Sequence, residues 1–259
     1  MARYQVILVY DGTEFFGFQR QARERTVQGV VEDALRRIGW QGRTILAAGR
    51  TDTGVHASGQ VIAFDLDWAH SALDLRNGLN ANLPSDVAAH QVFVARPGFH
   101  PRYDAIARRY RYQIYCQPTR DPIRERYAWR VWPALSCEAL QQAARFLPGR
   151  HDFSAFGTPP RTGGTTERIV SEASWQAVGD QFTFEVVANA FLYRMVRRLV
   201  SVQVAIVQGN ISPEIMAVYL TGKPDELLQG LAPPQGLFLV EVMYPPGSRE
   251  YLSGGSIPG

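Results

Sequence analysis

The sequence is poor in lysine, cysteine and clustered histidine. Lys223 is the single lysine among 27 basic residues, so the other 26 are arginine. Cys116 and Cys137 are the two cysteines, too few for a disulfide scaffold or a four-cysteine zinc site. The five histidines show no HxH or HxxxH spacing. We therefore expect no metal site.

Long apolar runs are also missing. A membrane-spanning helix needs about 20 apolar residues, and the longest candidate here, residues 199–207, is interrupted by Ser201 and Gln203. The N-terminus reaches acidic residues early and lacks a small-residue cleavage site, which argues against a secretory signal. We expect a cytoplasmic protein that does not contact a membrane.

The overall composition is typical of a globular protein. The chain has 259 residues, of which 46% are hydrophobic and 20% charged, and its net charge is +3. That balance supports a packed core and argues against disorder. The arginine excess has two explanations. It can reflect a GC-rich genome or adaptation to heat, or it can serve phosphate binding, since guanidinium groups bind phosphate in a planar fork. Composition by itself favours the explanation from genome composition or heat.

The residue pattern of the first half, residues 1–98, predicts a β-α-β-β-α-β order. β-branched and aromatic runs indicate strands, and apolar residues at helical spacing indicate helices. Thr26 is a suitable N-cap for the first helix. The predicted strands are residues 3–10, 43–48, 60–65 and 87–94, and the predicted helices are residues 27–38 and 72–83.

The second half, residues 99–246, repeats that order, and residues 247–259 form a tail. Its predicted strands are residues 107–116, 169–177, 181–189 and 237–244, and its predicted helices are residues 136–147, 191–208 and 211–221, with a loop over 149–166. We expect an α+β fold of two ferredoxin-like or RRM-like halves. Their mainly antiparallel sheets are expected to join about a pseudo-twofold axis, with helices on one face and a central cleft.

Arginines concentrate between residues 101 and 130. That segment has eight arginines against three acidic residues, a charge of +5, and tyrosines lie between them. Cations beside aromatic planes are typical of RNA-binding surfaces. The alternative is an ordinary strand, because alternation puts Arg109 and Arg111 on one face and Tyr110 and Tyr112 on the other. The pattern leaves both interpretations open.

The loop GRTDTGVHAS, residues 49–58, carries the strongest candidate for chemistry. Three interpretations compete: a structural turn, a phosphate cradle and a catalytic carboxylate. The loop lacks the GxxxxGK[ST] and GxGxxG spacings of phosphate cradles. Arg50 and Asp52 are two residues apart, so an extended chain points them the same way, and a guanidinium beside the carboxylate favours its ionised form.

Seven segments together resemble one known family. GRTDTGVHA is similar to the catalytic motif of the tRNA pseudouridine synthase A family, and the resemblance extends in order over residues 4–244. The other segments are YDGTEFFGFQRQ (10–21), TVQ (26–28), NANLP (80–84), ARRYRY (107–112), NAFLYRMVR (189–197) and GLFLVEV (236–242). Several motifs in order at compatible spacing make the resemblance specific.

The resemblance implies that uridines at positions 38, 39 and 40 in the anticodon stem-loop of tRNA are isomerised to pseudouridine. It also implies a homodimer, with each tRNA contacting both subunits, and neither metal nor other cofactor. Asp52 would be the catalytic aspartate, and Arg50 would contact the RNA or help expel the target base. Tyr110 would pack against the flipped base, and Arg197 would hold the Asp52 carboxylate through a salt bridge.

Other readings of the residues remain open. The carboxylate can attack a carbon covalently or remove a sugar proton. A non-catalytic RNA-binding module of two RRM-like halves is the main alternative function, and a metal-dependent hydrolase would need ligands that the histidine spacing does not offer. His56 is interpreted as a loop hydrogen-bonding residue, and Arg161 and Arg168 receive no role.

Overall fold

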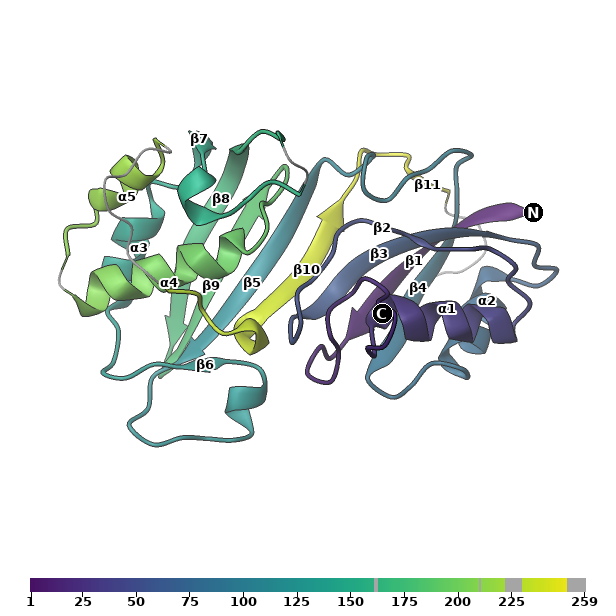
Figure 1. The fold of residues 1–259 in the computed structure, drawn as a ribbon, viewed down its shortest axis with the longest axis horizontal. Helices are drawn as coiled ribbons and strands as arrows, with labels where there is room; N and C mark the ends of the chain where they lie inside the picture. Colours follow the sequence, from purple (N-terminus) through teal and green to yellow (C-terminus); the bar gives the residue numbers. More distant parts are fainter. Residues whose placement is uncertain (161–162, 210, 222–229, 251–259) are drawn as a thin grey trace. The chain divides into compact units, whose positions relative to one another are not determined.

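A computed structural model describes residues 1–160, 163–209, 211–221 and 230–250. The chain forms two compact units, one from Met1–Ile106 together with the chain from Glu241 onward, the other from Ala107–Val240. Arg161, Lys223 and residues 251–259 of the expected tail lie outside the described residues. Each unit is built on its own run of strands and helices (Figure 1).

The first unit has the predicted β-α-β-β-α-β order, followed by a short strand from the end of the chain. Its helices are α1 (Val27–Arg37) and α2 (Ala72–Asn80), and its strands are β1 (Ala2–Tyr10), β2 (Leu46–Ala47), β3 (His56–Leu66), β4 (Val87–Ala95) and β11 (Arg249–Glu250). The strand order is β11-β4-β1-β3, with β2 pairing β3. The pairs β1–β3, β1–β4, β4–β11 and β2–β3 are all antiparallel.

Side-chain caps fix where the two helices begin. The Thr26 hydroxyl accepts a hydrogen bond from the Gly29 N–H, which confirms Thr26 as the N-cap of α1. Ser71 and Asp74 form a capping box at the start of α2. Between its ends α1 buries Val31 and Leu35 at helical spacing, so the apolar stripe in the sequence is the face that packs on the sheet.

The second strand is much shorter than the predicted 43–48. The buried Glu32 carboxylate of α1 accepts a hydrogen bond from the Ile45 N–H at 3.1 Å, and Gln28 donates to the Thr44 hydroxyl at 2.8 Å. These groups of the segment are thereby bound to α1. The strand that pairs with β3 is limited to Leu46–Ala47, and the next residue, Ala48, donates its N–H to the Val61 carbonyl at 2.8 Å.

The second unit contains the remaining strands and helices. Its strands are β5 (Ala107–Tyr115), β6 (Trp129–Arg130), β7 (Gly149–Asp152), β8 (Glu167–Val178), β9 (Gln181–Ala188) and β10 (Leu237–Met243). The last three residues of β10 belong to the first unit. Its α-helices are α3 (Cys137–Ala144), α4 (Met195–Gln208) and α5 (Ile215–Tyr219), and its 3₁₀ turns are η1 (Arg124–Arg126), η2 (Ser154–Phe156) and η3 (Pro234–Gly236). The strand order is β10-β5-β9-β8-β7.

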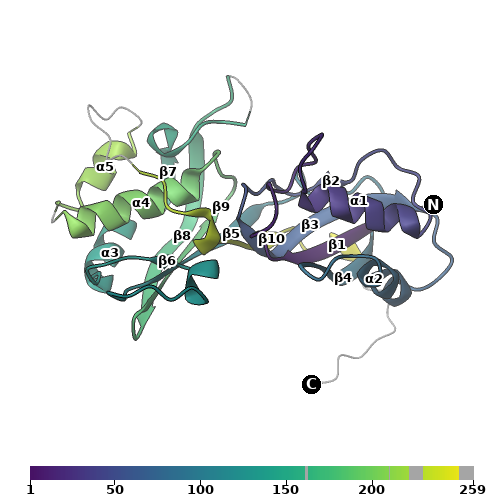
Figure 2. The ribbon, with the colours of Figure 1, turned by 60° about the horizontal axis from the view of Figure 1, so that its bottom comes forward.

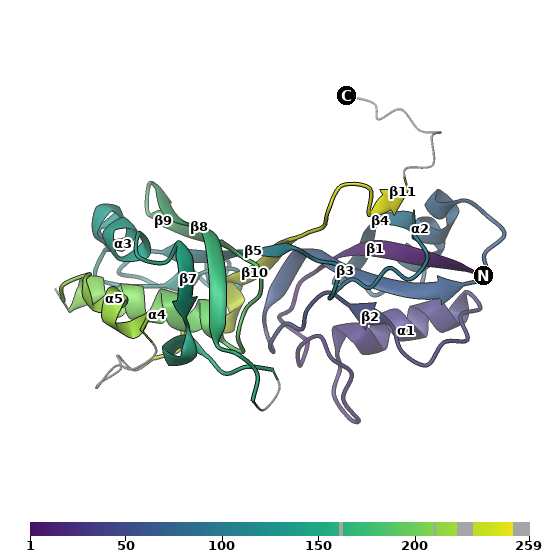
Figure 3. The ribbon, with the colours of Figure 1, turned by 90° about the horizontal axis from the view of Figure 1, so that it is seen from above.

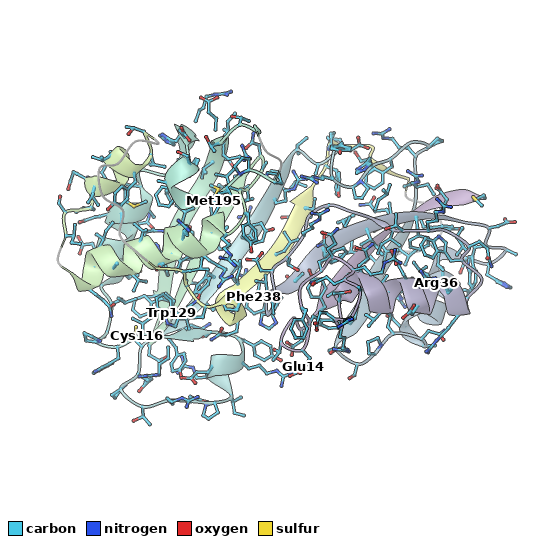
Figure 4. All side chains as sticks on the ribbon, viewed as in Figure 1. Glu14, Arg36, Cys116, Trp129, Met195 and Phe238 are labelled. Carbon is cyan, nitrogen blue, oxygen red and sulfur yellow. The ribbon has the colours of Figure 1, made fainter. Side chains whose placement is uncertain are left out.

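In this unit α4 lies over one face of the sheet, and α5 lies next to it (Figures 2 and 3). Met195 in the first turn of α4 is labelled in Figure 4. The β5–β9, β8–β9 and β7–β8 pairs are antiparallel, and β6 pairs with β5 in parallel. The α+β class with a mostly antiparallel sheet is therefore confirmed.

Three predicted elements of the second unit differ from the structure. The helix predicted over 191–208 begins at Met195, because Arg194 before it has φ 64° and cannot continue a right-handed helix. The helix predicted over 211–221 is limited to Ile215–Tyr219. The predicted loop over 149–166 contains the strand β7, which pairs with β8. No helix in the described part of the chain is both long and apolar enough to cross a membrane.

Candidate active site

The loop that carries Asp52 is fixed by hydrogen bonds before and after the aspartate. Before it, Gln60 donates its side-chain amide to the Gly49 carbonyl at 2.9 Å, and the Thr51 carbonyl accepts the Phe18 N–H at 3.0 Å. After it, the Val55 N–H donates to the Asp52 carbonyl at 3.1 Å and closes a turn. The backbone on both sides of Asp52 is therefore held in one conformation.

Residues 11–21, the segment YDGTEFFGFQRQ after its tyrosine, form the support for that loop. A Cβ atom on Gly12 would lie 2.1 Å from the Val55 carbonyl oxygen, and one on Gly17 would lie 2.8 Å from the Thr51 carbonyl oxygen. The Gly54 N–H also donates to the Phe15 carbonyl at 3.3 Å. Glycine lets the two backbones approach this closely, so the first motif positions the second.

Side chains reinforce the contact between the two loops. The Tyr10 hydroxyl and the buried Thr51 hydroxyl share a hydrogen bond of 2.8 Å. The Gly12 N–H donates to Nδ1 of the buried His56 at 3.0 Å. The same Nδ1 lies 3.2 Å from an Asp11 carboxylate oxygen, so the His56 ring links the two loops, the hydrogen-bonding role that its sequence context indicated. Asp11 accepts hydrogen bonds from the Thr13 N–H and hydroxyl and forms a turn.

The support is anchored in turn to α1. Arg20 donates to the buried Glu32 carboxylate at 2.6 Å, and its N–H donates to the Gln28 side chain at 3.0 Å. Gln28 donates to Glu32 at 2.8 Å. The Glu32 charge, which is fully buried, is thus matched by a guanidinium and several donors. Figure 4 shows side chains of the support, including Glu14, and Arg36 near the end of α1.

Asp52 and Arg50 differ in exposure. Asp52 is half-buried and Arg50 is exposed, whereas Thr51 between them is buried. A half-buried carboxylate on a rigid loop can approach a substrate while part of its solvation is removed. The guanidinium two residues away is exposed to solvent.

Tyr110 lies on β5 in the second unit and packs on an aromatic neighbour. Its ring centroid is 4.8 Å from that of Phe191, at an interplanar angle of 74°. The side chain is half-buried, so part of the ring faces solvent while Phe191 holds it in place. Phe191 therefore fixes the position of the Tyr110 ring through an edge-to-face contact.

Arg197, in the first turn of α4, is 9% exposed. Its Nε donates to the Ala232 carbonyl at 2.7 Å, and the Ala232 N–H donates back to the Arg197 carbonyl at 3.2 Å. The next residue, Pro233, accepts a hydrogen bond of 2.7 Å from the Tyr112 hydroxyl. Burial raises the pKa of Tyr112 well above its usual value, and the charge of nearby Arg197 opposes that rise. The hydroxyl therefore stays protonated and acts as a donor.

The Tyr112→Phe variant tests this hydrogen bond. It leaves the Pro233 carbonyl without its donor, so we expect the free energy of unfolding in urea to fall by about 1 kcal/mol. Tyr4→Phe is the control, because Tyr4 is also buried and its hydroxyl bonds no described residue. Equal stability of the two variants would show that the Tyr112 hydroxyl contributes nothing.

At least five arginines between residues 101 and 130 form ion pairs, three of them with acids elsewhere in the second unit and two with Glu125 of the segment itself. Arg111 donates twice to Glu185 of β9, at 2.8 and 2.6 Å, and Arg109 donates to Glu172 of β8 at 2.8 Å. Ion pairs also involve three more arginines of the segment: Arg120, Arg124 and Arg130. For Arg109 and Arg111, which lie on β5, the ordinary strand-face interpretation is sufficient. Tyr112 and Tyr115 are core residues with no exposed ring.

One of these ion pairs makes stability depend on pH. Asp180 accepts two hydrogen bonds from Arg124, at 2.6 and 2.9 Å, and one from Gln117, which lower its pKa from 3.8 to about 2. A depressed carboxyl pKa stabilises the fold above the unfolded pKa, and that contribution is lost as the pH falls toward the folded value. We expect wild type to lose more unfolding free energy than Asp180→Asn between pH 4 and pH 2, measured in urea. Equal losses would contradict the ion pair.

Arg168, which the sequence left without a role, has a structural environment. It is 7% exposed, and its Nη1 donates to the carbonyls of Thr165 and Glu167 at 2.9 and 2.6 Å. Burial lowers its pKa. It therefore ties the turn before β8 to the strand.

The candidate residues are divided between the two units. Asp52 and Arg50 share the fixed loop of the first unit, and Tyr110 and Arg197 belong to the second, so the Asp52–Arg197 salt bridge stays a prediction. Phe191 was missed as the neighbour of Tyr110. No sequence signal identifies it, because the contact depends on the pairing of β5 with β9. Among the described residues, no group of three or more His, Cys, Asp or Glu side chains could hold a metal ion.

The chain is similar to known proteins over most of its length. A family model described as tRNA pseudouridine synthase matches residues 6–104 and 143–245. These ranges contain Arg50, Asp52 and Arg197, whereas Tyr110 lies between them. Proteins named tRNA pseudouridine synthase A from Thermotoga petrophila and Geobacter sulfurreducens are each 38% identical, over 94% of this chain and 100% of their own length. The protein of that name from Geobacillus kaustophilus is 40% identical over 93% of this chain and 94% of its own length.

Proposed function

Because the chain belongs to the tRNA pseudouridine synthase family and is an enzyme that isomerises uridine in tRNA, we propose that its targets are positions 38, 39 and 40 of the anticodon stem-loop and that Asp52 is its catalytic residue. The observation that carries the second part is the fixed loop around Asp52, with hydrogen bonds to the backbone before and after it. Catalytic groups need such preorganised support. Membership in a family of enzymes argues against the non-catalytic RNA-binding alternative.

The reaction requires one bond to break and one to form. The bond between N1 of uracil and C1′ of the ribose breaks, the base rotates, and C5 bonds to C1′. The proton on C5 is then lost and N1 gains one, so the product is an isomer. A base within a stem must first leave the stack, at a cost of about a few kcal/mol. An ionised Asp52 can serve by covalent attack on a carbon or by removal of a sugar proton.

The other candidate residues have roles that suit their surroundings. The exposed Arg50 contacts the RNA or occupies the position of the displaced base. Tyr110, held edge-on by Phe191, packs against the flipped uracil. Arg197, whose Nε is fixed by the Ala232 carbonyl, forms the salt bridge with Asp52 and so orients the carboxylate.

The proposal includes the setting in which the enzyme works. It acts in the cytoplasm as a homodimer, with each tRNA contacting both subunits, and uses neither a metal nor another cofactor. Isomerisation that continues in excess EDTA, together with a dimer mass in solution, is the expected result. Loss of activity on chelation, or a monomer mass at active concentrations, would contradict this part.

Mapping the modified positions tests the target. Unmodified transcripts of a tRNA with uridine at positions 38, 39 and 40 are incubated with the protein, and pseudouridine is located by chemical adduct formation and primer extension. We expect new stops at those three positions. The control is the same transcript with cytidine there. Modification elsewhere in the tRNA with none in the anticodon stem-loop would overturn the proposed target, while leaving the family activity intact.

A further inference from the structure

The backbone just before α4 is held in an unusual conformation. Arg194 has φ 64° and ψ 7°, and no other described residue except glycine has a positive φ. For an L residue the left-handed region costs about 1–2 kcal/mol. Such strain persists only where surrounding structure enforces it, and it gathers at functional sites.

The enforcing structure is the loop around Gly157. The Tyr193 N–H donates to the Thr158 carbonyl at 2.9 Å, and the two residues form a β-bridge. A Cβ atom on Gly157 would lie 2.5 Å from the Tyr193 carbonyl oxygen. Tyr193 is thereby clamped at its backbone on one side, and α4 begins at Met195 on the other.

The strained segment carries two exposed side chains. Tyr193 is 51% exposed and Arg194 is exposed, and the Arg194 guanidinium carbon lies 4.7 Å from the centroid of the Tyr193 ring. Arg198, one turn further along α4, is exposed as well. In the described part of the chain neither arginine forms an ion pair with a carboxylate. This contrasts with the arginine-rich segment, where at least five of the eight arginines do.

We propose that Tyr193 and Arg194 form an RNA-binding site, in which the tyrosine ring stacks on an unpaired base and the guanidinium binds an adjacent phosphate. The inference rests on the proposed tRNA substrate and adds a contact to it. A guanidinium held on an aromatic ring keeps its edge N–H groups available for phosphate oxygens. Because the pair is already stacked and its backbone clamped, binding orders few additional torsions.

The test separates RNA binding from a purely structural role. Arg194→Gly removes the charge and also relieves the left-handed strain, since glycine adopts positive φ without penalty. Affinity for a fluorescein-labelled anticodon stem-loop RNA is measured by anisotropy at several salt concentrations. We expect affinity to fall about tenfold and the slope of log K against log salt to lessen by roughly 0.7–0.9, the value for one phosphate contact. Unfolding free energy in urea should be unchanged or higher.

Tyr193→Ala tests the stacking half. We expect a loss of affinity of about five- to 100-fold with an unchanged salt slope, because base stacking carries no charge. Tyr193→Phe keeps the ring and should bind like wild type. Arg145→Ala is the matched control. The exposed Arg145 guanidinium also lies over an aromatic ring, with its carbon 5.0 Å from the centroid of Phe146, but it pairs with Glu214 at 3.6 Å. It should bind RNA like wild type.

Two outcomes would overturn the site. One is an Arg194→Gly variant that binds RNA as tightly as wild type. The other is a variant that loses affinity and stability together, which is the result that a purely structural role predicts. If wild type converts tRNA and these variants bind equally well, this inference alone fails. If wild type neither binds the RNA nor converts any tRNA, the proposed function fails with it.

Discussion

Asp52→Asn should lower the release of tritium from tRNA that carries C5-tritiated uridine by about 10³-fold or more. Isomerisation removes the C5 hydrogen, so released label counts turnovers. Asparagine preserves the size of the side chain and the backbone turn in which the Asp52 carbonyl accepts the Val55 N–H. Its amide, however, can neither attack carbon nor accept a proton at neutral pH. General base catalysis by itself contributes about 10²–10⁴-fold.

The matched control for this variant is Asp67→Asn. Asp67 is an aspartate of the same unit whose side chain is 91% exposed and lies 3.6 Å from the chain's N-terminal amine. It should release tritium at the wild-type rate. Unfolding in urea shows whether either variant is damaged in its fold. Substantial release by a folded Asp52→Asn protein would exclude Asp52 as the catalytic residue.

Gly12→Ala should have the largest effect on stability of any single methyl group added near the site. The new Cβ would lie 2.1 Å from the Val55 oxygen and 2.5 Å from its carbonyl carbon. Both atoms are backbone, so no rotamer change relieves the overlap, and one of the two loops must move. We expect a loss of about 3 kcal/mol in unfolding free energy. Because Val55 closes the turn at Asp52, the rate should fall by roughly 10²-fold, as for a displacement of about 1 Å.

Gly49→Ala provides the control on the catalytic loop itself. No atom lies within 4 Å of the position of its Cβ, and its φ is outside the left-handed region. Its unfolding free energy should stay within about 0.5 kcal/mol of wild type, with an unchanged rate of tritium release. If Gly12→Ala were as stable and active as Gly49→Ala, the support of the catalytic loop by residues 11–21 would be contradicted.

The accuracy of the sequence prediction varied with the range of the interactions involved. The start of α1 was correct because Thr26 caps it through a residue three positions away. The start of α4 was wrong because the Thr158 and Gly157 contacts hold the chain before it outside the helical conformation. The second strand was overestimated because the Glu32 carboxylate binds the Ile45 N–H. Nothing local signals either of these two contacts.

The sequence by itself determined the class of fold, the order of its long elements and the family, because periodicity, caps and ordered motifs are local properties of the chain. It also predicted Asp52, on the loop GRTDTGVHAS, as the catalytic residue, a role that the Asp52→Asn experiment tests. Only the tertiary structure decided which arginines form ion pairs with carboxylates. Arg109 and Arg111 meet Glu172 and Glu185 because β5 pairs with β9 and β9 with β8, whereas no carboxylate among the described residues pairs with Arg194. Electrostatic balance depends on distances between residues remote in sequence, and those distances are set by strand register.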